Sequence, residues 1–130
     1  MSTSVPSANL RLKRAYEPAE PGDVVRILVD RLWPRGVSKE KAALAAWLKP
    51  LSPSDALRKR YHGETADSDE AWDEFRLDYF AELDAGGEEV KVALFTLDTA
   101  GAAGPVTLLY AAKSEARNNA VALREWLERR

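Results

Sequence analysis

The chain has 130 residues, of which 45% are hydrophobic and 31% are charged, and its formal net charge is −2. This length fits one domain with a real core, and the composition is that of an ordinary globular protein rather than a disordered or membrane-spanning one. The slightly acidic balance argues against wholesale binding of nucleic acid, which usually needs a basic surface.

Residue types that are absent or rare exclude several kinds of chemistry. The chain has no cysteine, which excludes disulfides, thiolate nucleophiles and cysteine-held metals. The single histidine, His62, excludes a multi-histidine metal site, and we interpret His62-Gly63 as the C-terminal end of a helix. We therefore expect no metal and no cofactor.

The N-terminal residues and the hydropathy of the chain lead us to expect a cytoplasmic protein. Residues 1–8 are expected to form a flexible tail rather than a signal peptide, because they lack both a basic and an apolar region. No apolar run approaches the roughly 20 residues that span a bilayer. We expect a cytoplasmic protein without membrane contact, in which residues 9–130 form a single α/β domain.

The first 37 residues predict two strands. Residues 9–16 alternate apolar and charged side chains, which is typical of an edge strand with one solvated face. Residues 17–23 contain two prolines and a glycine and predict a loop. Residues 24–30 form a nearly continuous apolar second strand in which Arg26 is the one internal charge, and Pro34 then breaks the pattern.

Three helices are predicted in the middle of the chain. Ser38 is a suitable N-cap for a helix reaching about Lys49, and Ser52 with Pro53 opens a second, shorter helix. Ser68 begins the longest one. The apolar stripe of this helix, which we expect to be core rather than a stacking platform, consists of Trp72, Phe75, Tyr79 and Leu83.

The last third of the chain predicts a helix, a strand and a helix. The helix covers about residues 88–100, and residues 105–112 form an almost wholly apolar strand that we expect at the centre of a sheet. Ser114 caps the final helix. The order of elements predicts an α/β fold with a small, mostly parallel sheet of about three or more strands, flanked by helices in three layers.

Three blocks carry a resemblance to a known family: L-K-R-A-Y-E-P at 12–18, V-D-R-L-W-P-R-G-V-S-K at 29–39 and V-T-L-L-Y-A-A-K at 106–113. Together they resemble the domain of unknown function 488 (DUF488) family, in its YeaO-like branch, over nearly the whole chain after residue 8. The resemblance implies a compact cytoplasmic α/β protein and no established activity.

Two departures from the family pattern limit what the resemblance implies. Other branches carry a cysteine after the last strand, where this chain has Tyr110 and Ala111. YeaO-like members often have histidine near the start of the last helix, where this chain has Arg117 and Asn119. The resemblance therefore implies neither thiol nor histidine chemistry here.

In open α/β sheets, ligands bind outside the carboxyl ends of the strands. The second and last strands, if adjacent and parallel, bring a largely cationic cluster to this edge, together with a helix N-terminus that attracts anions. We therefore predict a site for a carboxylate- or phosphate-bearing small molecule. The candidate ligand-binding residues are Arg14, Asp30, Arg31, Trp33, Arg35, Tyr110, Lys113 and Ser114. The candidate acids and bases, if the protein is an enzyme, are Asp30, Tyr110, Lys113 and Glu115.

Two alternatives stay open. In a purely structural account, Asp30 pairs with Arg31 or Arg35 to close a corner, Trp33 packs into the core and Lys113 is solvated. Because an unpaired carboxylate at the end of an apolar strand is costly, we predict that a basic residue of the 31–35 turn or Lys113 holds Asp30. In the other alternative, the protein is an interaction module that presents an Arg-Trp surface to a protein or nucleic-acid partner. An exposed Trp33 favours this recognition surface, whereas a buried Trp33 beside a cleft favours a ligand site. Common nucleotide fingerprints are absent from the sequence.

Overall fold

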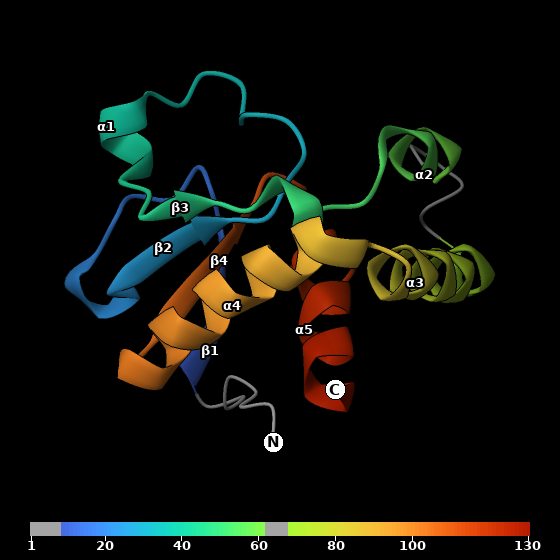
Figure 1. Ribbon diagram of the computed structural model, residues 1–130. Coiled ribbons are helices and arrows are strands. Elements are labelled where there is room, and N and C mark those ends of the chain that lie inside the picture. Colours follow the sequence, from blue (N-terminus) through green and yellow to red (C-terminus); the bar gives the residue numbers. More distant parts are fainter. Residues whose placement is uncertain (1–8, 62–67) are drawn as a thin grey trace.

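The computed structural model describes residues 9–61 and 68–130, and in these ranges a four-stranded sheet with the strand order β1-β4-β2-β3 forms the centre of the protein (Figure 1). Every pairing in the sheet is parallel, which confirms the predicted α/β class and the parallel sheet. The predicted tail at 1–8 and the helix end at His62-Gly63 lie outside the described residues. The strands are β1 (Leu10–Arg14), β2 (Val25–Leu28), β3 (Ala46–Trp47) and β4 (Val106–Tyr110).

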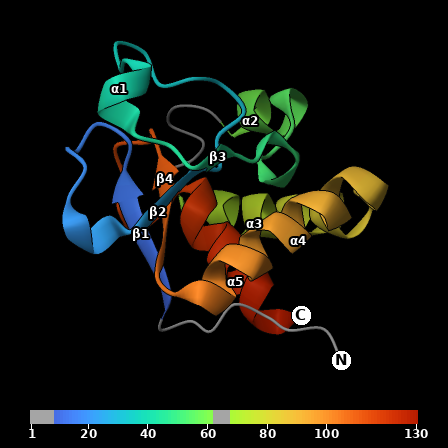
Figure 2. The same cartoon turned by 60° about the vertical axis from the view of Figure 1, so that its left-hand side comes forward.

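The longer helices α3, α4 and α5 lie together on one side of the sheet, and the short α1 lies on the other side (Figure 2). Among the described residues, no helix combines the length and the apolar character needed to cross a membrane. The helices are α1 (Lys39–Ala42), α2 (Asp55–Arg60), α3 (Asp69–Asp84), α4 (Gly87–Ala103) and α5 (Asn119–Arg129), with short 3₁₀ turns η2 (Pro21–Asp23) and η3 (Lys49–Leu51).

Strand β4 is the central strand, as its uninterrupted apolar run predicts. All five of its residues are buried, and it pairs with both β1 and β2. Strand β1 lies at the edge of the sheet, also as predicted. In the parallel register Leu28 faces Leu109 and Arg14 faces Tyr110, so β1, β2 and β4 all end at the same edge of the sheet.

The sheet has a core on each face. Alternate residues of β2 and β4, such as Ile27 and Leu108, join the large core formed with α3, α4 and α5. Leu28 and Leu109 point to the opposite face, where they pack with Trp33 and other residues of the segment between β2 and β3. This segment and α1 thus form a thin third layer.

The helix predicted from Ser38 to about Lys49 is wrong beyond its first turn. Ser38 does cap α1, but Ala43 adopts a left-handed conformation (φ 49°) and ends the helix after four residues. The chain then returns to the sheet as β3, where the Ala45 amide donates to the Arg26 carbonyl at 2.8 Å. Pairing with the free edge of β2 therefore overrides the helical spacing of the apolar residues.

Two predicted helix caps are displaced, while the cap at Ser68 is confirmed. Helix α2 is capped by Ser54 rather than Ser52. Helix α5 is capped by Asn118, and Ser114 instead accepts a hydrogen bond from the Arg117 amide in the preceding turn. Asparagine and serine are equally good N-caps, so the local sequence favours neither position strongly.

A buried ionic cluster fixes the face of the sheet that carries α1. Arg26, only 3% exposed, donates to Asp23 at 2.6 Å and to the Ala42 carbonyl at 2.8 Å. Burial alone would raise the pKa of Asp23, but hydrogen bonds from Lys13, the Glu20 amide and Arg26 lower it below its ordinary value. The one charge inside β2 is therefore paired, and it ties α1 to the sheet.

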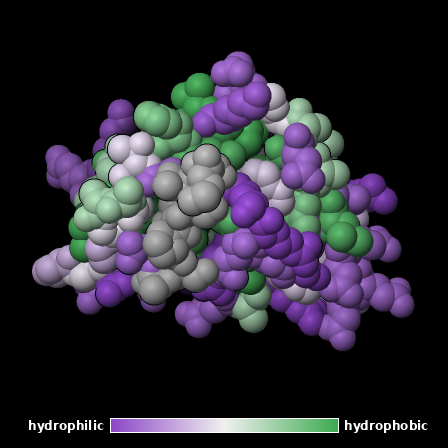
Figure 3. Space-filling model, turned by 60° about the horizontal axis from the view of Figure 1, so that its bottom comes forward, coloured by the Kyte–Doolittle hydropathy of each residue, from purple (hydrophilic) through white to green (hydrophobic). Residues whose placement is uncertain are grey.

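Surface hydrophobic residues are scattered. On the face shown in Figure 3, hydrophobic and hydrophilic side chains alternate in small groups. The large hydrophobic residues that are exposed on the described part of the chain are Val24, Leu32, Leu77, Val92 and Phe95.

We predict that Leu109→Ala lowers the free energy of unfolding by about 2–5 kcal/mol, because it removes a fully buried leucine from the central strand. Leu77→Ala is the matched control, since Leu77 is 63% exposed on α3 and its loss should change stability by no more than about 0.5 kcal/mol. Urea unfolding measures both, and equal midpoints for the two variants would contradict the assignment of β4.

Candidate functional site

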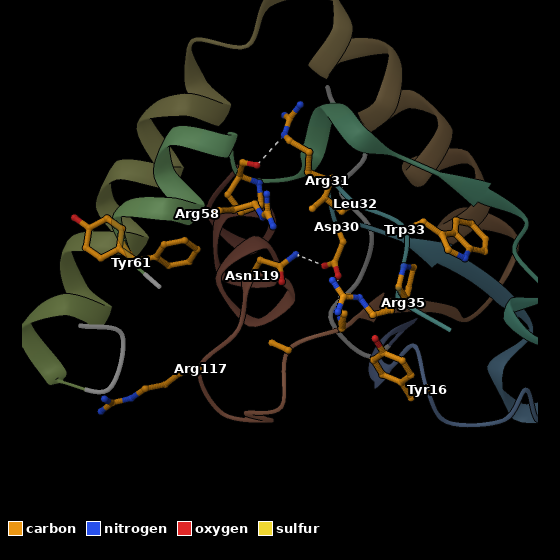
Figure 4. A pocket seen from close by; sticks show the side chains of 15 residues that line it. Tyr16, Asp30, Arg31, Leu32, Trp33, Arg35, Arg58, Tyr61, Arg117 and Asn119 are labelled. Atoms are coloured by element: carbon orange, nitrogen blue, oxygen red, sulfur yellow. Dashed lines mark hydrogen bonds between the residues drawn. The ribbon is translucent and has the colours of Figure 1, made fainter. Parts of the chain in front are cut away.

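A cavity of about 540 Å³ opens where β2 and β4 end (Figure 4). Among the residues that the structure describes, its lining holds four arginines but one carboxylate, that of Asp30. Aromatic rings form much of the remaining wall. The arginines are Arg31, Arg35, Arg58 and Arg117, and the aromatic residues are Tyr16, Trp33, Tyr61 and Phe75.

Asp30 connects the elements that surround the cavity. It follows β2, and its carboxylate oxygens accept hydrogen bonds from the Ala111 amide after β4 and from the Asn119 side chain at the start of α5, both at 2.9 Å. Burial raises the pKa of Asp30 above its ordinary value, and the hydrogen bonds from Asn119 and Ala111 offset only part of this rise.

The expected ion pair of Asp30 is not formed. None of the ion pairs between described residues includes Asp30, so the prediction that Arg31, Arg35 or Lys113 holds it is wrong. Two uncharged N–H groups satisfy the carboxylate instead. The cationic charge of the cavity is therefore not neutralised by its one acid.

The segment after Asp30 places three further predicted site residues, Arg31, Trp33 and Arg35, around the cavity. Arg31 donates from Nε to the Pro53 carbonyl at 3.0 Å, which leaves its two Nη groups without a hydrogen bond to the described residues. Arg35 is exposed and makes no hydrogen bond or ion pair with the described part of the chain. Gly36 allows the turn behind it, since its φ of 80° is a conformation that other residues avoid.

Trp33 forms a wall of the cavity rather than an exposed recognition surface. The indole is half-buried, and its Nε1 donates to the Val37 carbonyl at 2.6 Å. Its ring packs edge-on against Trp47, with centroids 5.5 Å apart. This placement fits the ligand-site interpretation better than the interaction module.

Four other predicted site residues do not line the cavity. Arg14 donates to the carbonyls that follow β4 and lies over the ring of Tyr16, a neighbour that does line the cavity. Tyr110 is buried in the core, and burial raises the pKa of its hydroxyl. Lys113 and Ser114 are exposed outside the cavity.

Sequence reasoning missed the side of the cavity that α2 and α3 supply. Arg58 lies on α2, Tyr61 follows it, and Phe75 lies on α3. The helical spacing of Tyr61 and Phe75 predicts core packing. The local sequence gives no sign that the two helices converge on the end of β2. Arg117 and Asn119 stand out in the sequence only where the family pattern has histidine.

Three of these residues are held by carboxylates outside the cavity. Arg58 pairs with Asp55 at 2.8 Å within α2, and Arg117 pairs with Asp69 at the start of α3. The Tyr61 hydroxyl donates to Asp78 at 2.8 Å. Burial and this hydrogen bond raise the pKa of Tyr61 to about 12, so the phenol stays protonated at neutral pH.

Comparison with known proteins supports the family resemblance. The family model described as the inactive DUF488-N3 subclade matches residues 9–130. The uncharacterized protein YeaO of Escherichia coli is 45% identical over 119 residues, which cover 92% of this chain and 96% of that protein. The uncharacterized protein Rv3073c of Mycobacterium tuberculosis is 34% identical over 126 residues, which cover 97% of this chain and 99% of that protein. No solved structure gives a significant match.

We predict that Asp30→Ala lowers the free energy of unfolding by about 1–3 kcal/mol, because it removes the acceptor from the Ala111 amide and from one N–H of Asn119. Asp73→Ala is the matched control, since Asp73 forms only an exposed ion pair within α3. Such pairs contribute about 0–1 kcal/mol. Denaturant unfolding at neutral pH measures both variants, and an Asp30 variant no less stable than the Asp73 variant would refute the role of Asp30 as a connector.

Proposed function

This chain belongs to the DUF488 family, in the subclade described as inactive, and we propose that it binds a small molecule carrying a carboxylate or a phosphate in the cavity at the ends of β2 and β4. The observation that carries the proposal is the excess of arginines over carboxylates among the described residues of the lining. Guanidinium groups bind planar and tetrahedral oxyanions through paired N–H donors. A volume of about 540 Å³ is also typical of small-ligand sites.

The electrostatics of Asp30 support the same proposal. Its carboxylate opposes anion binding while it is ionised, and burial raises its pKa, so protonation removes this opposition at a higher pH than for an ordinary aspartate. Arg35 lacks a partner in the described part of the chain, and Arg31 keeps its Nη groups available. At Arg31 and Arg35, the cavity therefore presents N–H donors that no acceptor of the described residues occupies.

We propose binding rather than turnover. The described residues of the cavity lining include no serine, threonine or histidine; the hydroxyl groups there belong to Tyr16 and Tyr61, and that of Tyr61 is engaged by Asp78. The description of the subclade as inactive supports this choice.

We predict that phosphate or sulfate raises the melting temperature of the wild-type protein and has little effect on Arg35→Ala. A ligand at about 100 times its dissociation constant stabilises the folded state by roughly 2.7 kcal/mol. Lys113→Ala is the matched control, since Lys113 is exposed and does not line the cavity, so this variant should respond like the wild type. Equal shifts in all three proteins at fixed ionic strength would show generic salt stabilisation and remove the proposal.

Arg35→Lys should restore the thermal shift only in part. An ammonium group keeps the charge, but it lacks the planar fork of donors that binds two oxygens of one anion. Titration calorimetry with phosphate is expected to rank the affinities as arginine, then lysine, then alanine. Full recovery with lysine would indicate that position 35 contributes charge alone.

We predict that sulfate affinity rises as the pH falls from neutral towards the raised pKa of Asp30. Sulfate remains a dianion in this range, whereas protonation of Asp30 removes the negative charge that faces it. Asp30→Asn should flatten this dependence, and Asp73→Asn, on the exposed side of α3, should leave it unchanged. An unchanged pH profile in Asp30→Asn would show that another group governs it.

A further inference from the structure

A second hollow with aromatic walls lies next to the main cavity. This hollow has a volume of about 90 Å³ and shares Tyr61, Phe75, Arg117 and Asn119 with the main cavity. Its further lining includes Trp72. One ligand can therefore occupy both spaces, with its charged part among the arginines and another part in the hollow.

The walls of the second hollow suit a flat ring. On α3, the ring of Phe75 stacks on Trp72, with centroids 5.8 Å apart and planes at 19°. The same ring meets Tyr61 edge-on, with centroids 5.7 Å apart. Aromatic rings prefer such offset-stacked and edge-to-face neighbours. Figure 4 shows Tyr61 on the opposite side of Asp30 and Asn119 from Tyr16, so the ring site and the Arg35 end of the cavity are separate.

Asn119 offers one specific hydrogen-bonding group to this ring. Both N–H donors of its carboxamide are engaged, by the Val29 carbonyl at 3.0 Å and by Asp30 Oδ1 at 2.9 Å. Because both partners are acceptors, the orientation of the carboxamide is fixed. The oxygen of Asn119 accepts no hydrogen bond from a described residue. Asn119 lines both the main cavity and the second hollow.

The neighbouring Asn118 makes the contrast clear. Its oxygen accepts from the Val121 amide at 2.9 Å and its nitrogen donates to the Ser114 carbonyl at 2.9 Å, so this side chain caps α5. Two adjacent asparagines therefore have different tasks. Asn118 begins the helix, and Asn119 presents an acceptor where the two hollows meet.

From this arrangement, and resting on the anion site proposed above, we propose that the ligand is a phosphate- or carboxylate-bearing nitrogen heterocycle with an N–H donor on its ring edge. The ring lies against Phe75, its donor binds the oxygen of Asn119, and its anionic group binds among the arginines of the main cavity. A ring without a donor leaves the Asn119 oxygen unpaired once water is displaced, and it is therefore bound less tightly.

Three probes separate the parts of this proposal. Ribose 5-phosphate carries only the anion, purine riboside 5′-monophosphate adds the ring, and adenosine 5′-monophosphate adds the amino donor. Titration calorimetry on the full chain should show tighter binding at each addition, with about a tenfold gain for the amino group. If ribose 5-phosphate binds and neither nucleotide binds more tightly, the ring proposal fails and the anion site stands. If ribose 5-phosphate and inorganic phosphate both fail to bind, the anion site fails as well.

Variants test the residues assigned to the ring. Asn119→Ala should abolish the difference in affinity between the two nucleotides, because it removes the acceptor for the amino group. Phe75→Leu should weaken both nucleotides about tenfold and spare ribose 5-phosphate, whereas Phe95→Leu, at a phenylalanine that is 73% exposed on α4, should change none of the three. If Asn119→Ala does not fold, Phe75→Leu still decides the proposal. Equal nucleotide affinities in Phe75→Leu and Phe95→Leu would overturn it.

Discussion

The carboxylate of Asp30 is the contact on which the candidate site depends. It accepts one hydrogen bond from the residue after β4 and another from the start of α5, so it joins β2, β4 and α5 at one point. Asp30 is only partly buried, but a carboxylate that loses part of its hydration is stabilised by such donors. The groups that donate to this carboxylate are uncharged, so they neutralise neither its negative charge nor the positive charge of the surrounding arginines. The structural requirement at Asp30 therefore leaves guanidinium groups available for a ligand.

The sheet could be predicted from the sequence where its strands carry their own signal. The run at Val106–Tyr110 has no polar interruption, so its central place follows from the apolar pattern alone. Strand β3 could not be predicted in this way. It has only two residues, and it exists because the edge of β2 offers backbone partners to a segment whose apolar spacing also fits a helix. Pairing between distant segments decided the outcome, and the local pattern does not contain that information.

The candidate site was predictable to the extent that it is local. Asp30, Arg31, Trp33 and Arg35 follow one strand directly, and a parallel sheet brings the end of such a strand to a common edge. The opposite wall comes from α2 and α3, whose approach depends on how the helices pack. The contribution expected from Ser114 was displaced because Asn118, four residues later, begins α5. Helix spacing identifies the buried stripe of α3, but it does not show that one edge of Phe75 remains open to a cavity.

Two ion-paired arginines, Arg26 and Arg58, differ in what their ion pairs can do. Arg26 is buried with Asp23, and such a pair cannot be opened without leaving an uncompensated charge in the core. Arg58 is held by Asp55 in an ion pair that is partly exposed to solvent. Exposed pairs contribute about 0–1 kcal/mol, so an anionic ligand of the kind proposed above would displace Asp55 at little cost. The buried pair thus stabilises the sheet on the α1 side, and the exposed pair orients a guanidinium at the cavity while leaving it exchangeable. This separation allows one small domain to hold its buried charge in a fixed pair and still present guanidinium groups at the cavity.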